Sequence, residues 1–197
     1  MKTDIILAGV GGQGILSIAA SIGQAALKNK MHVKQAETHG MSQRGGDVVS
    51  HLRISDKPIF SDLIPKGKAD LIIAVEPMEG LRYVPYLSEN GYLVTNTTPF
   101  KNIIDYPPIE GILEQIQKVP NLISFNADQI AADLKSKRSS NMVMLGASSP
   151  FLNGISFEVL QEGIREIFGQ KGDEIVALNI KAFASGKEQS DKILSQK

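Results

Sequence analysis

The stretch LAGVGGQGIL, residues 7–16, decides the fold class of this chain. Gly9, Gly11 and Gly14 have the G-x-G-x-x-G spacing, with Gly12 as a fourth glycine among them. An apolar run precedes the glycines, and apolar residues recur at helical spacing after them, so the pattern predicts a strand, a tight turn and a helix. Glycines allow the backbone to approach a ligand closely, and the first N–H groups of a helix favour an anion. We therefore expect an anion near residues 12–14.

The same alternation of strand and helix continues along the chain. Strands are predicted at about 4–9, 32–37, 47–55, 70–75, 91–96 and 121–125, with helices at about 12–28, 77–84, 110–118, 127–136, 140–149, 156–168 and 173–187. This order predicts a three-layer α/β/α domain with a mostly parallel sheet and a Rossmann-like first βαβ unit. The run 71–75 is apolar on both faces, which is typical of a central parallel strand, whereas 47–55 alternates and predicts an antiparallel strand near an edge with one wetter face. We expect one domain over 1–188 and a polar tail at 189–197 that frays.

The composition excludes several kinds of site. The 21 basic and 21 acidic residues cancel, which argues against a nucleic-acid partner. No apolar run reaches the roughly 18 residues of a membrane helix, so we expect a cytoplasmic protein without a membrane partner. The chain has no cysteine, so it holds neither a thiolate-bound iron–sulfur cluster nor a cysteine zinc site. Redox chemistry would need another chain or a bound cofactor.

A second polar and glycine-rich loop lies in ETHGMSQRGGDVVSHLRIS, residues 37–55. It is predicted to leave the carboxyl end of the second strand, beside the first glycine turn, where open α/β sheets bind ligands. Arg44 has a guanidinium that holds a phosphate or carboxylate through two hydrogen bonds, and glycines beside it let the backbone come close. The candidate ligand or partner-binding residues of this loop are Glu37, His39, Gly40, Ser42, Gln43, Arg44, Gly45 and Gly46. A plain solvated connection is the alternative interpretation.

Two other chemistries use residue types that occur in this loop. Glu37, His39 and His51 are residue types that bind metals, but their spacing matches no compact motif and strand alternation turns His51 away, so we expect no metal site. Ser42 has no nucleophile-elbow context, so a catalytic triad is not expected either.

Together with this loop, three further motifs carry a resemblance over essentially the whole chain. GVGGQG near the N-terminus, HGMSQRGG, NMVMLGA at 141–147 and NIKAFASG at 179–186 resemble the gamma component of 2-oxoacid:ferredoxin oxidoreductases, most closely the small (beta) subunits of the indolepyruvate type. The matching positions are Gly9, Gly11, Gly12, Gln13, Gly14, Gly40, Ser42, Gln43, Arg44, Gly45, Gly46, Asn141 and Gly146.

The resemblance implies a part in oxidative decarboxylation of an aryl 2-oxoacid to an acyl-coenzyme A, with ferredoxin as electron acceptor. It places thiamine diphosphate and iron–sulfur clusters on a large (alpha) partner subunit and no cofactor on this chain alone, with coenzyme A as a candidate co-substrate. Whether the loops contact coenzyme A, the partner or each other stays open. Asn141 has a second interpretation as a helix N-cap, and Gly146 as a helix-packing residue.

Two alternatives from other functional classes also remain. In a stand-alone NAD(P)-dependent enzyme, Glu37 would hold the ribose, although it lies 28 residues after Gly9 rather than about 20. In a non-catalytic assembly subunit, all the loops would contact the partner subunit and none would bind a ligand.

Overall fold

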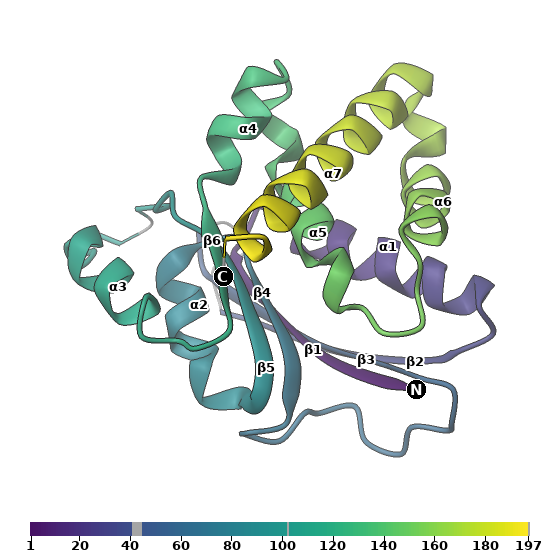
Figure 1. Cartoon of the computed structure of the whole chain (residues 1–197), viewed down its shortest axis with the longest axis horizontal. Coiled ribbons are helices and arrows are strands. Elements are labelled where there is room, and N and C mark those ends of the chain that lie inside the picture. The colour runs from purple at the N-terminus through teal and green to yellow at the C-terminus, as the bar shows by residue number, and fades with distance from the viewer. Residues whose placement is uncertain (41–44, 102, 197) are drawn as a thin grey trace.

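A six-stranded mixed sheet forms the centre of the protein, with helices on both of its faces (Figure 1). The structure is a computed structural model that describes residues 1–40, 45–101 and 103–196. The strands are β1 (Lys2–Val10), β2 (His32–His39), β3 (Asp47–Ser55), β4 (Ala69–Ala74), β5 (Leu87–Asn96) and β6 (Leu122–Phe125). The helices are α1 (Ile15–Lys28), α2 (Pro77–Tyr83), α3 (Ile109–Ile116), α4 (Ala127–Asp133), α5 (Ser140–Ser148), α6 (Phe157–Phe168) and α7 (Asp173–Leu194), with short 3₁₀ turns at Val84–Tyr86, Lys137–Ser139, Ser149–Phe151 and Gly169–Lys171.

The strand order is β2-β3-β1-β4-β5-β6. β1, β4, β5 and β6 pair in parallel, whereas β3 is antiparallel to both β1 and β2. The predicted three-layer fold and the antiparallel direction of β3 are confirmed. One detail differs from a simple Rossmann-like first unit: β3 lies between β1 and β2, so the two strands joined by α1 are not neighbours.

The two faces of the sheet bury separate cores because successive strand residues point to opposite sides. Ile5 and Leu7 of β1 pack with α1, α5, α6 and α7, whereas Ile6 and Ala8 pack towards α2 and α3. Figure 1 shows α2 and α3 on one side of the sheet and the remaining helices on the other. The carboxyl ends of the parallel strands therefore open between two helical layers.

β3 is more buried than its alternating pattern predicts. The expectation of one wetter face is wrong, because His51 is buried and Arg53 is covered by its partners. The Nδ1 atom of His51 accepts a hydrogen bond from the N–H of Ile64 at 3.1 Å, and the Arg53 guanidinium pairs with buried Asp4 at 2.8 Å. The loop between β3 and β4 thus covers the polar face that the sequence pattern left exposed.

Helices α5 and α7 approach so closely that each needs a glycine at the crossing. A Cβ on Gly146 would lie 1.8 Å from the carbonyl oxygen of Phe183, and one on Gly186 would lie 1.9 Å from that of Val143. This supports the packing interpretation of Gly146. α7 also continues to Leu194 with Ser190 buried, so the predicted frayed tail is wrong over residues 189–194. No helix in the described ranges is both long enough and apolar enough to span a bilayer.

Candidate functional site

The glycine turn between β1 and α1 lies at the carboxyl edge of the sheet. Gly12 and Gly14 have φ values of 101° and 80°, which side chains with a Cβ rarely adopt. The side chain of Gln13 holds this turn, since its Oε1 accepts from the N–H of Val10 at 2.8 Å and its Nε2 donates to the carbonyl of Val75 at 3.4 Å. The turn is therefore fixed to the ends of β1 and β4 before any ligand arrives.

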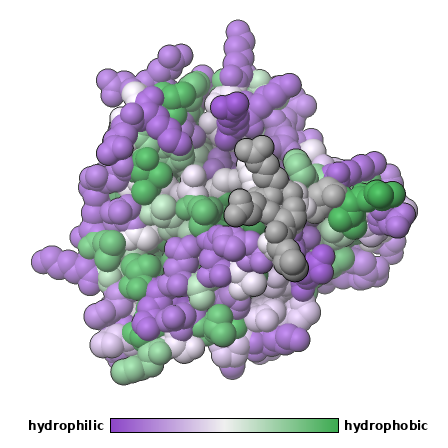
Figure 2. Space-filling model, turned by 180° about the vertical axis from the view of Figure 1, so that it is seen from behind, coloured by the Kyte–Doolittle hydropathy of each residue, from purple (hydrophilic) through white to green (hydrophobic). Residues whose placement is uncertain are grey.

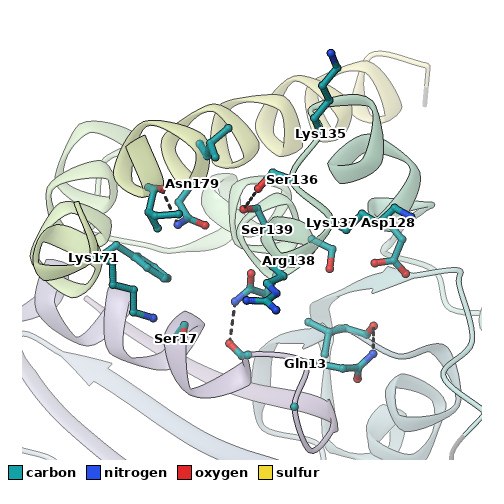
Figure 3. A pocket seen from close by; sticks show the side chains of 18 of the residues that line it. Gln13, Ser17, Asp128, Lys135, Ser136, Lys137, Arg138, Ser139, Lys171 and Asn179 are labelled. Atoms are coloured by element: carbon teal, nitrogen blue, oxygen red, sulfur yellow. Dashed lines mark hydrogen bonds between the residues drawn. The ribbon is translucent and has the colours of Figure 1, made fainter. Parts of the chain in front are cut away.

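A cleft of about 760 Å³ opens over this turn. That volume lies within the range of about 300–1,000 Å³ that is typical of small-molecule sites. The glycine turn, α4, the segment before α5 and the start of α7 surround the cleft (Figure 3). Its lining comprises Gly12, Gln13, Gly14, Ser17, Val75, Phe100, Asp128, Lys135, Ser136, Lys137, Arg138, Ser139, Ser140, Asn141, Phe168, Lys171, Ile175, Leu178 and Asn179.

The lining is strongly cationic. Among its described residues, four are lysine or arginine and only Asp128 is acidic. Figure 3 shows Arg138 and Lys171 directed into the cavity from opposite sides, whereas the ammonium group of Lys135 points away from it. Positive charge above a helix start favours an anionic ligand, and phosphate is the group that arginine binds best through paired hydrogen bonds.

A chain of hydrogen bonds positions the carboxylate of Asp128 in the cleft. The Nδ2 atom of Asn96, at the end of β5, donates to Asp128 Oδ2 at 3.1 Å and to the carbonyl of Val75 at 3.3 Å. Gln13 donates to the same Val75 carbonyl. The ends of β1, β4 and β5 and the start of α4 are thereby joined by buried or partly buried polar contacts. The contact with Asn96 fixes the position of the Asp128 carboxylate in the cleft.

The structure decides between the two interpretations of Asn141 and gives a reason for Gly9. Asn141 is not the N-cap of α5, because Ser139 precedes the helix; instead its Nδ2 donates to the Gly14 carbonyl at 3.1 Å. Asn141 thus joins the glycine turn to α5 and lines the cleft. Gly9 lies buried within β1, where a Cβ would meet the Val75 side chain at 2.3 Å, so close packing explains it.

A second hollow of about 640 Å³ lies on the other side of the glycine turn. Glu37 and His39 face it, and the Glu37 carboxylate lies 2.9 Å from His39 Nδ1. Its lining is Val10, Gly11, Gly12, Gly14, Ile15, Leu16, Glu37, His39, Gly40 and Val48. The end of β2, which carries Glu37 and His39, and the glycine turn therefore share one surface, and the predicted proximity of the two segments is confirmed.

The end of the second loop binds the glycine turn through its backbone. The N–H of Gly11 donates to the Gly46 carbonyl at 2.9 Å, and the N–H of Gly45 donates to the Gly11 carbonyl at 3.5 Å. Ser42, Gln43 and Arg44 lie outside the described residues. Their predicted role in ligand or partner binding stays a prediction.

The three residues considered for a metal are not brought together. Glu37 of β2 is opposite Ser50 of β3 in the strand register, so its side chain lies on the face of the sheet that α1 covers. The side chain of His51 lies on the opposite face, beside the ring of Tyr86. Burial lowers the pKa of His51, and its Nδ1 atom is used by Ile64. Within the described ranges, no group of three histidine or acidic residues is arranged to hold a metal ion.

The cationic group is the main feature that the sequence interpretation missed. Lys135, Lys137 and Arg138 occur in KSKRSSN, residues 135–141, immediately before the predicted motif at Asn141. This run of charge beside small polar residues was the available signal. Lys171, however, comes from the 3₁₀ turn Gly169–Lys171 before α7, and only the fold brings it to the same cleft.

Comparisons with known proteins show the family of this chain. Residues 4–189 match the family model described as pyruvate ferredoxin/flavodoxin oxidoreductase. The chain is 39% identical to indolepyruvate oxidoreductase subunit IorB of Archaeoglobus fulgidus, covering 96% of each chain, and 35% identical to the protein of the same name from Pyrococcus horikoshii, covering 98% of each. It is 27% identical to the common gamma subunit of pyruvate/ketoisovalerate oxidoreductases of Thermococcus kodakarensis, covering 84% of this chain and 86% of the relative.

Two solved structures have the same fold. The 2-oxoglutarate:ferredoxin oxidoreductase of Magnetococcus marinus, solved with 2-oxoglutarate, coenzyme A and succinyl-CoA bound, superposes with a TM-score of 0.76 at 25% identity. The match covers 97% of this chain but only 31% of that longer polypeptide. Subunit PORC of the pyruvate oxidoreductase of Thermotoga maritima superposes with a TM-score of 0.72 at 22% identity, covering 95% and 96% of the two chains.

Proposed function

The chain belongs to the pyruvate ferredoxin/flavodoxin oxidoreductase family, and from this membership we propose that it is the small subunit of a thiamine-dependent 2-oxoacid:ferredoxin oxidoreductase that forms an acyl-coenzyme A. The substrate is indolepyruvate or a related aryl 2-oxoacid, an assignment supported by the names of the relatives that are 39% and 35% identical. The absence of cysteine supports a division of labour in which the large subunit carries the redox centres.

In such an enzyme the partner's thiamine diphosphate supplies the decarboxylation chemistry, and its iron–sulfur clusters pass electrons to ferredoxin. This chain binds and orients coenzyme A. The single observation that carries the assignment is the cationic cleft above the glycine turn, with Arg138 and Lys171 directed into it. Three phosphate groups make coenzyme A strongly anionic, so it fits this charge. The Magnetococcus marinus structure with coenzyme A bound supports the same choice of ligand.

Different residues of the cleft bind different parts of coenzyme A. Arg138 and Lys171 pair with phosphate oxygens, and the N–H groups near Gly12 and Gly14 add donors at the positive end of α1. Asp128, held by Asn96, accepts from a hydroxyl or amino group of the nucleotide. Arg44 stays a proposed additional anion contact from the second loop. A protein that lacks its own redox centre thereby presents the acyl acceptor to its partner.

Calorimetry with coenzyme A tests this proposal. We expect Arg138→Gln to weaken binding by about 10- to 100-fold, the equivalent of losing one charge-assisted contact of roughly 1.5–3 kcal/mol. Lys66→Gln is the matched control, since Lys66 is exposed in the loop between β3 and β4 at the other edge of the sheet. If Arg138→Gln and Lys66→Gln bound coenzyme A equally well, the assignment of coenzyme A to this cleft would be contradicted. Failure of the complex with the large subunit to bind coenzyme A would contradict it too.

The same experiment distinguishes the alternatives. Saturable micromolar binding of NAD or NADP by this chain would favour the stand-alone enzyme. Assembly with the large subunit without any coenzyme A contact from this chain would favour a purely structural subunit. We also expect the isolated chain to give no viologen reduction with indolepyruvate and coenzyme A.

A further inference from the structure

Three apolar side chains are exposed in close succession after β5. Phe100, Ile103 and Ile104, together called the post-β5 patch, have exposed fractions of 45%, 50% and 103%. Isolated apolar residues on a surface need no explanation, but a concentrated group commonly marks a contact site. Figure 2 shows hydrophobic atoms gathered on the lobe that projects at the right, the side on which α3 lies in that view.

The patch is continuous with the candidate coenzyme A cleft. Phe100 lines that cleft, and the segment carrying Ile103 and Ile104 leads from it towards α3. β5 ends at Asn96, so the patch lies at the carboxyl edge of the parallel strands. It therefore occupies the same edge of the sheet as the glycine turn.

A buried carboxylate anchors this segment at both ends. Glu76 is completely buried, and its Oε1 accepts a hydrogen bond from the Tyr106 hydroxyl at 2.5 Å and from the Phe100 N–H at 3.3 Å. Its other oxygen accepts from the N–H of Glu79 at 2.9 Å. Burial and the Glu76 carboxylate raise the pKa of Tyr106, so the phenol keeps the proton that it donates. A segment held in this way loses less conformational entropy when a partner binds it.

We propose that the post-β5 patch is a docking contact for the large subunit of the oxidoreductase. The inference rests on the proposed function, in which the acyl group is formed on the partner and the acceptor is held in the cleft. Transfer between them requires the partner to cover the cleft edge, and the post-β5 patch is an apolar surface that continues from the cleft through Phe100. A second exposed pair, Phe60 and Leu63, lies in the loop between β3 and β4 at the opposite edge.

Assembly of the full-length chain with the large subunit isolated from the native complex tests the surface. The side chain of Ile104 is fully exposed, so replacing it with aspartate removes no buried apolar contact and should leave the fold unaffected. We expect the dissociation constant of the Ile104→Asp variant for the large subunit to rise by roughly tenfold or more, because a charge at the centre of an apolar contact leaves it unpaired and desolvated. Phe60→Asp is the matched control, since Phe60 is 94% exposed at the other edge, and it should bind as the wild type does.

The possible outcomes separate this inference from the proposed function. Wild-type affinity of the Ile104→Asp variant, or a loss confined to Phe60→Asp, overturns the docking surface while leaving the proposed function intact. A change only in self-association of the isolated chain would assign the patch to a second copy and also overturn it. If the wild-type chain fails to bind the thiamine-bearing subunit, both proposals fall. A melting temperature equal to that of the wild type excludes unfolding as the cause of weaker binding.

Discussion

Gly14 and Asn141 are expected to be energetically coupled, because one side chain occupies the space that the other would need. Gly14 has φ 80°, and a Cβ added there would lie 2.4 Å from the Asn141 Nδ2 atom. The same Cβ would lie 3.6 Å from the Cβ of Asn141, which is an ordinary contact. Removing the amide of Asn141 should therefore relieve the collision but not the backbone strain.

The size of the coupling follows from these contacts. Gly14→Ala forces a left-handed conformation that costs alanine about 1–2 kcal/mol, and it also displaces the Asn141 amide from the Gly14 carbonyl, which costs about 1 kcal/mol more. Asn141→Ala already loses that hydrogen bond. In the double variant the backbone strain remains, but the displacement cost does not recur. The loss of unfolding free energy should then be smaller than the sum of the two single losses by about 1 kcal/mol or more.

Urea unfolding of the two single variants and the double variant, followed by far-ultraviolet circular dichroism, measures this difference. Gly12→Ala combined with Asn141→Ala is the control cycle, because Gly12 also has a positive φ of 101° but a Cβ there would meet nothing within 4 Å. In this control cycle the losses of unfolding free energy of the two single variants should add up to the loss of the double variant. Additivity of the Gly14 and Asn141 losses within about 0.3 kcal/mol would refute the proposed contact between the turn and α5.

Two further predictions concern the stability of the scaffold. Burial lowers the pKa of the His51 imidazole below 6.5 in the folded protein. The stability that the neutral imidazole contributes is therefore complete above pH 6.5, and it is lost as the pH falls through the lowered pKa. The His51→Gln variant keeps an acceptor for the Ile64 N–H but does not titrate, so the midpoint of urea unfolding should depend less on pH between about pH 7.5 and 5. An unchanged pH profile would contradict this. Gly146→Ala should lower the unfolding free energy by about 1–3 kcal/mol, because its Cβ would lie 1.8 Å from the Phe183 carbonyl oxygen. Gly169→Ala, with nothing within 4 Å, should change it by less than about 0.5 kcal/mol; equal losses would mean that the helix crossing is not limited by Gly146.

Local patterns were enough to predict the elements of this protein. The strand–turn–helix around Gly12, the continuous apolar run 71–75 and the alternation in 47–55 each depend on neighbours along the chain, and the structure has β1, α1, β4 and β3 at those places. The positive φ angles of Gly12 and Gly14 are a local property of the turn and do not depend on the rest of the fold. Motifs spread over the whole chain also identified the family, which the comparisons confirm.

Only the tertiary structure decided what those elements enclose. The insertion of β3 between β1 and β2 depends on hydrogen bonds between strands, and nothing in the periodicity of one strand specifies its neighbour. The sequence leaves Asn141 open between a binding residue and a helix cap, and only the fold places it against Gly14, 127 positions earlier. Arg138 and Lys171 likewise read as ordinary surface charges on two separate segments. Their convergence on one cleft results from the packing of α5 against α7, which no local pattern encodes.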